Sequence, residues 1–276
     1  MALNPMGSVL GLRLAMMLFL SVFPHVSRAS GGMDPQEIFF VQPRPVGHPI
    51  VGTPLSAEVS IEYTPTPGEG SPVFPKRRSA MLYRNSDGKT RVEIFRHVPR
   101  EQNERPEIID FTDPKECIGD VLDVRNHIDH RISLREVPFM MAGGCCPEKM
   151  IALQSAELSL LTVAGKTMPN LGYGSRGDGI NVDPIAEIDG FDVEGYGQRL
   201  TLPKGTNGNQ KDITVTIKTW YAPSIKAVML IEVIDSRSGI TKIGLSNVKK
   251  GEPEPSFFVL PSGYRLVEEK ESFNLR

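Results

Sequence analysis

The densest group of ionisable side chains is the stretch NHIDH at 126–130, which places His127, Asp129 and His130 within four positions. Imidazole and carboxylate groups are the ligands that zinc and iron take from proteins. On an extended chain, however, His127 and Asp129 share one face and His130 points to the other. A metal site needs at least three converging ligands, and no distant third ligand is evident. We therefore predict no metal, no cofactor and no catalytic residue.

The three cysteines, Cys117, Cys145 and Cys146, are the second candidate for chemistry. An odd number in an oxidising compartment allows at most one internal disulfide, for which we favour Cys117 with one of the adjacent pair. The alternative is that all three are small buried residues. Adjacent cysteines lack the C-x-x-C spacing of thiol oxidoreductases, so we do not predict that activity.

The N-terminus has the pattern of a secretory signal peptide over residues 1–29. Arg13 precedes the apolar run LAMMLFLSVF at 14–23, Pro24 ends it, and the small residues Ser27 and Ala29 precede the expected cleavage site. The run is about half the roughly 20 residues that span a bilayer. We expect a soluble chain in the periplasm or secreted, with no stable transmembrane segment after cleavage.

Charge argues against a nucleic-acid partner. The whole chain has a formal charge of −2, and cleavage after residue 29 removes two arginines and no acid, which leaves −4. Phosphate binding needs a concentrated surplus of Lys and Arg, whereas the basic runs at 76–78 and 249–250 are short. We expect a proline-rich arm at 30–56 and one domain at 57–276.

Strand patterns dominate that domain. In AEVSIEYT at 57–64, apolar and polar residues alternate with the period of a half-buried strand. Asp87-Gly88 between two β-prone runs predicts a hairpin. Further strands are expected at 107–111, 117–124, 130–134, 213–221, 226–235 and 239–248. Such short spacing predicts an antiparallel sheet.

An insert at about 136–186 interrupts the strands. Pro147, Glu148 and Gly165 stand at the start and stop positions of a helix, and apolar residues between them share one broad face. We predict an amphipathic helix that covers the sheet. The following stretch, 168–184, is predicted to be a loop, although it contains a literal G-x-G-x-x-G that lacks the strand and helix of a dinucleotide site.

The candidate ligand-binding residues are Trp220, Met229 and Ile231. Trp220 is the one tryptophan of the chain and shares its predicted face with Thr and Lys. Met229 and Ile231 lie on a strand that is apolar on both faces, as expected where a sheet is covered on one side.

The region from 187 onward resembles uncharacterised exported bacterial proteins with the fold of the periplasmic outer-membrane lipoprotein carriers (LolA/LolB-like). The resemblance rests on VEG at 193–195, LPKGTNGN at 202–209, TWYAPSIKAVML from 219 and the tail LSNVKKGEPEPSFFVLPSGYRL. It implies an α+β fold, mainly antiparallel β, with a strongly curved open sheet (a half-barrel) whose concave face is covered by one or more helices. The family has no catalytic motif to transfer.

Three functions follow from these observations. The chain is expected to be a carrier that holds a lipid, an acyl chain or another apolar ligand in the concavity of the sheet. The first alternative is an interaction module for envelope-stress sensing or assembly that binds a segment of an envelope protein. The second alternative is a metal- or thiol-dependent enzyme, which the residue patterns above do not favour.

Overall fold

The computed structural model describes residues 39–41, 50–67, 74–98, 100–101, 103–133, 176–206, 208–270 and 273–275. Contacts divide the chain into Met1–Glu37 and Ile38–Arg276. Every element below belongs to the second unit. The predicted signal peptide, Cys145 and Cys146 lie outside the described residues.

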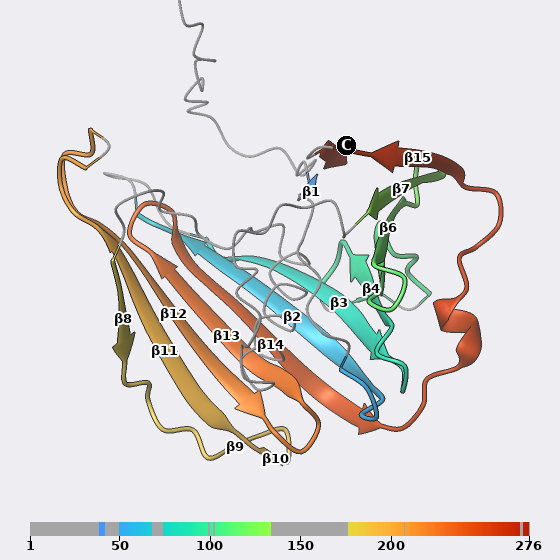
Figure 1. The fold of residues 1–276 in the computed structure, drawn as a ribbon, viewed down its shortest axis with the longest axis horizontal. Helices are drawn as coiled ribbons and strands as arrows, with labels where there is room; N and C mark the ends of the chain where they lie inside the picture. Colours follow the sequence, from blue (N-terminus) through green and yellow to red (C-terminus); the bar gives the residue numbers. More distant parts are fainter. Residues whose placement is uncertain are drawn as a thin grey trace, which may run out of the picture. The chain divides into compact units, whose positions relative to one another are not determined.

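An open, strongly curved sheet of 12 strands forms this unit, in the order β15-β7-β6-β5-β4-β3-β2-β14-β13-β12-β11-β8 (Figure 1). Two further ribbons of two strands each pair β1 with β16 and β9 with β10. The strands are β1 Phe39–Val41, β2 Leu55–Pro65, β3 Lys76–Arg84, β4 Thr90–Phe95, β5 Ile108–Asp113, β6 Ile118–Asp123, β7 Ile128–Ser133, β8 Arg176–Ile180, β9 Glu187–Ile188, β10 Phe191–Asp192, β11 Glu194–Leu202, β12 Ile213–Ala222, β13 Ala227–Asp235, β14 Gly239–Lys250, β15 Arg265–Glu269 and β16 Phe273–Leu275.

The sheet consists of two antiparallel meanders joined side by side. Strands β2 to β7 follow one another, as do β11 to β14, and the antiparallel pairing of β14 with β2 joins the two sets. Among the described strands, the one parallel pair is β15 with β7. The segment between β14 and β15 therefore carries the chain from the middle of the sheet to one of its edges.

Local sequence explains the best-defined strands. In β2 the burial alternates residue by residue, with Leu55, Ala57, Val59 and Ile61 buried between more exposed neighbours. This is the period of a strand with one covered face. The predicted hairpin joins β3 to β4, and Gly88 has a φ of +84°, which glycine adopts without steric cost. The antiparallel sheet predicted from the sequence is present.

The predicted helical cover of the concave face is wrong for the described structure. The described residues contain no α-helix, and the short 3₁₀ turn η1, Pro255–Phe258, is their one helical element. The stretch 147–165, where the helix was expected, lies outside the described residues. No helix in the described part of the chain is long and apolar enough to cross a membrane. Short β ribbons, rather than a helix, pack against the apolar face here.

The predicted loop at 168–184 also contains a strand. β8 begins at Arg176 and pairs with β11 as the last strand of the sheet. The sequence does not predict this strand, because Gly177 and Gly179 are of a residue type that is depleted in strands and has no apolar side chain to show the alternating pattern of a strand.

Candidate functional site

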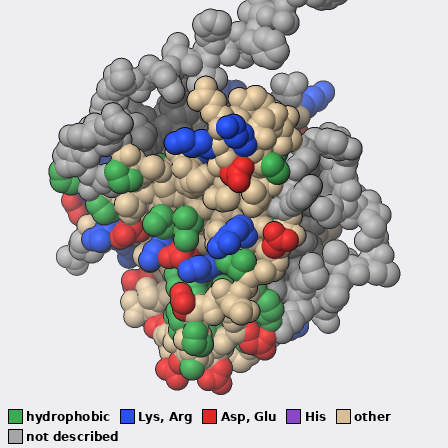
Figure 2. Space-filling model, turned by 90° about the vertical axis from the view of Figure 1, so that its left-hand side faces the viewer, with side chains coloured by type: hydrophobic (Ala, Val, Ile, Leu, Met, Phe, Trp, Pro, Cys, Tyr) green, Lys and Arg blue, Asp and Glu red, His purple; other side chains and the backbone are tan. Residues whose placement is uncertain are grey.

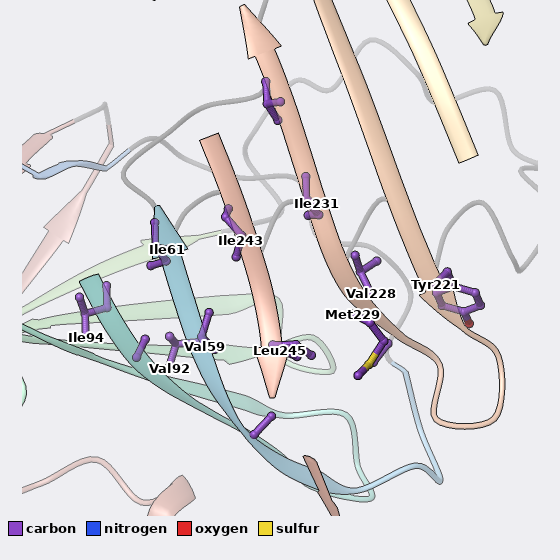
Figure 3. Packing of buried hydrophobic residues seen from close by; sticks show 14 of the residues in the cluster. Val59, Ile61, Val92, Ile94, Tyr221, Val228, Met229, Ile231, Ile243 and Leu245 are labelled. Carbon is purple, nitrogen blue, oxygen red and sulfur yellow. The ribbon is translucent and has the colours of Figure 1, made fainter. Parts of the chain in front are cut away.

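The larger apolar cluster of the protein lies on one face of the sheet, which we call the inner face; the opposite side is the outer face. Five residues directly opposite one another form a row across neighbouring strands: Leu245, Val59, Ala80, Ile94 and Ile108. All five are at most 6% exposed. Figure 3 shows most of this cluster, with side chains of β2, β4, β12, β13 and β14. The middle of the inner face is thus a continuous apolar surface.

Two ribbons pack against the inner face. From the β9–β10 hairpin and the residue after it, Ile188, Phe191 and Val193 contact the cluster. From β16, the half-buried Phe273 and the buried Leu275 do the same. Each ribbon is short, with two residue pairs in β9–β10 and three in β1–β16.

A turn and an irregularity in β14 fix the position of the β9–β10 hairpin. Asp189 and Gly190 both have positive φ, as a two-residue hairpin turn requires. An oxygen of Asp189 accepts a 2.7 Å hydrogen bond from the backbone N–H of Val248, where the pairing of β14 with β2 shifts register. The ammonium of Lys250 lies 5.0 Å from the centre of the Phe191 ring. The hairpin is therefore held at its tip by polar contacts and at its base by apolar ones.

Polar groups stand on the inner face near β15. His130 stacks on Phe273 with ring centres 4.5 Å apart, and its Nδ1 lies 2.6 Å from a carboxylate oxygen of Glu269. Asp110 and Asp123 are also buried, at 4% and 6% exposure. Asp123 accepts hydrogen bonds from the backbone N–H and the side-chain amide of Asn126. The inner face is apolar in its middle and polar toward this edge.

Arg84, at the end of β3, brings three distant segments together. Its Nε and Nη2 donate to the carbonyl oxygen of Thr53, its Nη1 to that of Lys226 at 2.9 Å, and its Nη2 also to that of Ile225. The side chain is 5% exposed. Burial lowers the pKa of Arg84 to about 10. Arg84 thus ties β3 to the segment before β2 and to the turn between β12 and β13.

The candidate ligand-binding residues do not share one face. Ile231 pairs with Thr219, and Trp220 pairs with Leu230, so Trp220 and Ile231 point to opposite sides of the sheet. Met229 and Ile231 are fully buried members of the inner cluster. Ligand binding by any of these residues stays a prediction, but Trp220 belongs to the outer face.

On the outer face, Trp220 holds the segment that follows β8. Its indole N–H donates to the carbonyl oxygen of Asp183 at 3.3 Å, and the Asp183 carboxylate lies 3.5 Å from the ammonium of Lys218. A Cβ added to Gly197 would lie 2.6 Å from Ile180, and one added to Gly195 would lie 2.3 Å from Val182. These two glycines let the segment lie directly against β11.

The β8 side of the molecule is charged. Figure 2 shows this side, where acidic side chains gather at the end that carries β9 and β10. The exposed acids of that region are Glu187, Asp189, Asp192 and Glu194. This end of the surface is therefore acidic, whereas Lys and Arg side chains lie elsewhere on the same side.

The segment between β14 and β15 also packs on the outer face, over strands β3 and β4, away from β8. Phe257 of η1 stacks on Tyr83 with ring centres 4.5 Å apart. The guanidinium of Arg91 donates to the Phe257 carbonyl and lies 5.0 Å from the centre of the Phe111 ring. Leu260 and Tyr264 pack against a second, smaller apolar cluster. Phe257 and Phe273 therefore contact opposite faces.

The group at 126–130 does not converge on one point. His127 lies in the turn before β7 with its ring 5.4 Å from that of Tyr264, Asp129 faces outward, and His130 faces inward. The described residues contain no group of three or more His, Cys, Asp or Glu side chains placed to hold a metal ion.

Cys117 is half-buried in the turn between β5 and β6, and its sulfur lies 3.6 Å from the carbonyl oxygen of Pro114. Since Cys145 and Cys146 lie outside the described residues, the disulfide stays a prediction.

Sequence reasoning missed Arg84, Asp189 and Phe273. The Asp-Gly pair at 189–190 is a hairpin signal of the same kind as the pair at 87–88. Arg84 and Phe273 had no local signal, because their roles depend on residues far away in the chain.

Comparison with known proteins finds solved structures to which the chain is similar. No family model and no curated protein matches the sequence. Among solved structures, the chain is similar to a LolA superfamily protein from Nitrosomonas europaea, with a TM-score of 0.33, 11% identity and coverage of 78% of this chain and 93% of that one.

Two further structures are similar. One is a DUF1329 family protein from Desulfovibrio piger, with a TM-score of 0.31, 14% identity and coverage of 75% and 90%. The other is described as an outer membrane lipoprotein-sorting protein domain from Vibrio parahaemolyticus, with a TM-score of 0.31, 10% identity and coverage of 74% and 88%.

Proposed function

We propose that this chain is an exported binding module that holds an apolar ligand, such as an acyl chain, on the inner face of its sheet. The observation that carries the proposal is the uninterrupted apolar row from Leu245 through Val59 to Ile108. A row across five strands measures about 20 Å at the usual spacing between strands. Burying each methylene of a ligand on the inner face contributes about 0.8 kcal/mol.

Access to the row comes from movement of a ribbon. The β1–β16 pair has three residue pairs and reaches the inner cluster through Phe273 and Leu275. An isolated two-stranded ribbon is marginally stable in water, so an acyl chain that buries more apolar area can replace it. The signal-like pattern of residues 1–29 supports a location in the periplasm or outside the cell.

A second candidate function is the binding of a segment of an envelope protein. β8 is the terminal strand of the sheet, and Gly177, Asp178 and Gly179 on it are exposed. An exposed edge offers backbone groups to an added strand. This module would use the edge of the sheet and leave the inner face occupied by the protein's own residues.

Mass spectrometry of the protein purified gently from its native envelope, intact and after organic extraction, distinguishes the two functions. The carrier function predicts a stoichiometric bound lipid. Val233→Thr, on the inner face, should reduce the bound amount, whereas Ile234→Thr, on the outer face of the same strand, should not. An empty protein, or one that arrives with a polypeptide, would favour the interaction module.

A further inference from the structure

Arg84 stands at one end of the inner apolar face. It is directly opposite Leu55 of β2, which is 1% exposed and belongs to the inner cluster. From Leu55 the inner residues of β2 continue through Ala57 and Val59 to Ile61. At the usual rise per residue, this line extends about 20 Å from Arg84, which is long enough for an extended acyl chain.

The positive charge of Arg84 has no counter-charge among the described residues. Its hydrogen bonds go to the carbonyl oxygens of Thr53, Ile225 and Lys226 and to the hydroxyl of Thr53, all of which are neutral. None of the ion pairs recorded within the described ranges includes it. Buried charges in proteins are normally paired, because desolvation is otherwise uncompensated.

One donor of the guanidinium remains available to an anion. Arginine has five N–H groups, two of them on Nη1. Within the described structure Nη1 makes one hydrogen bond, to Lys226, and so it has a second N–H to offer. The phenol of Tyr221, a member of the inner cluster, is close enough to affect the pKa of Arg84. Figure 3 shows Tyr221 beside Val228 and Met229. The cation therefore borders the apolar surface.

We propose that Arg84 forms an anion subsite for the head group of an amphiphile whose acyl chain lies along the inner face of β2. This inference rests on the proposed function, since the chain and the head group belong to one ligand. The head-group chemistry is a carboxylate or a phosphate, which accept charge-assisted hydrogen bonds from guanidinium. A neutral head group gains less binding free energy from the guanidinium, and a cationic head group is repelled by its charge.

A head-group series on the wild-type protein tests the subsite without any mutation. The neutral fluorophore N-phenyl-1-naphthylamine is bound first and then displaced by hexadecanoate, hexadecyl phosphate, hexadecanol or hexadecylamine. We expect the anions to bind at least about tenfold tighter than the alcohol, and the amine to bind weakest. The better of the two anions identifies carboxylate or phosphate as the natural head group.

Substitution at the subsite gives the second measurement. Arg84→Met should remove most of the difference in affinity between the anions and the alcohol. Arg91→Met is the matched control, because Arg91 lies on the outer face and pairs with Glu93 at 2.5 Å. Circular dichroism checks that each variant is folded. If Arg84→Met does not fold, the head-group series on the wild-type protein alone tests the anion subsite.

The outcomes separate the two proposals. Equal affinity of the anions and the alcohol for the wild-type protein, or an anion preference that survives in folded Arg84→Met, overturns the anion subsite and leaves the acyl-binding function intact. Failure of all four amphiphiles and of the fluorophore to bind overturns the acyl-binding function itself.

Discussion

Asp120 and Asp129 lie diagonally across β6 and β7 on the outer face, and of the two only Asp120 forms an ion pair within the described residues, with Arg131 at 2.7 Å. Asp129 is 6% exposed, and its Oδ1 has no hydrogen-bond partner among the described residues. Burial, with a smaller contribution from the Asp120 charge, raises the pKa of Asp129 to about 6, although Arg131 and His130 oppose the shift. On β15, Glu268 lies opposite Arg131.

Asp129→Asn should stabilise the protein at neutral pH. Because folding raises this pKa from 3.8 to about 6, the folded state binds the proton more tightly, and stability falls as pH rises through that interval. The variant cannot ionise, so it should be more stable than wild type by roughly 1–2 kcal/mol at pH 8 and about equal near pH 4.

Urea unfolding at pH 4, 6 and 8 measures this difference. Asp120→Asn is the control and should lose stability at pH 8, since it removes the partner of Arg131. A lower stability of Asp129→Asn at pH 8 would show that the Asp129 charge is stabilising.

Neighbouring positions of β13 should respond unequally to truncation. Ile231 is fully buried on the inner face, whereas Leu230 is half-buried on the outer face. Ile231→Ala should cost about 2–5 kcal/mol of unfolding free energy, because it leaves a cavity in the core. Leu230→Ala should cost clearly less. Equal losses in denaturant melts would mean that the inner face is no better packed than the outer one.

Gly197 should be intolerant of a side chain. A Cβ there would lie 2.6 Å from a side-chain carbon of Ile180 and 2.8 Å from its backbone oxygen. Gly197→Ala should cost about 1–3 kcal/mol and speed amide exchange in β8 and the residues after it. Gly179→Ala is the control, because nothing lies within 4 Å of its Cβ. Unchanged exchange in Gly197→Ala would argue against the close packing of β8 on β11.

Asp189 should stabilise the fold through the hydrogen bond that its side-chain oxygen accepts, rather than through its negative charge. Asp189→Ala removes the acceptor for the Val248 N–H and places alanine at a φ of +52°, so we expect a loss of about 1–2 kcal/mol. Asp189→Asn keeps an acceptor oxygen and suits this conformation, and it should lose less than about 0.5 kcal/mol. Thermal melts of both variants compare them. A larger loss with Asn than with Ala would point to the charge.

Many strands and turns of the sheet can be predicted from the sequence, because the patterns that indicate them involve only neighbouring residues. Alternation at 57–64 and the Asp87-Gly88 turn depend on neighbouring residues only, and both predictions hold. Pairing is not local. Which residues stand opposite Trp220 and Ile231 depends on the register of β12 against β13, including an irregularity at Trp220 and Tyr221.

Neither the cover of the inner face nor the role of Arg84 can be predicted from the sequence, because both depend on contacts between residues that are far apart in the chain. Arg84 contacts Ile225, which is 141 positions away, and Phe273 reaches the inner face through the chain's last described strand. An amphipathic pattern at 147–165 predicted a helical cover, whereas the described cover consists of short ribbons without a periodic signal.

The central requirement of the proposed function is an acyl ligand that lies on the inner face. Photo-crosslinking in the native envelope tests this with p-benzoylphenylalanine placed at Phe273, which packs on the inner cluster, or at Phe257, which stacks on Tyr83 of the outer face. After irradiation, the intact mass of the protein is measured. We predict an adduct with the mass of an acyl lipid at position 273 and none at 257. A lipid adduct at 257 alone, or at neither position, would show that the inner face does not bind an acyl lipid.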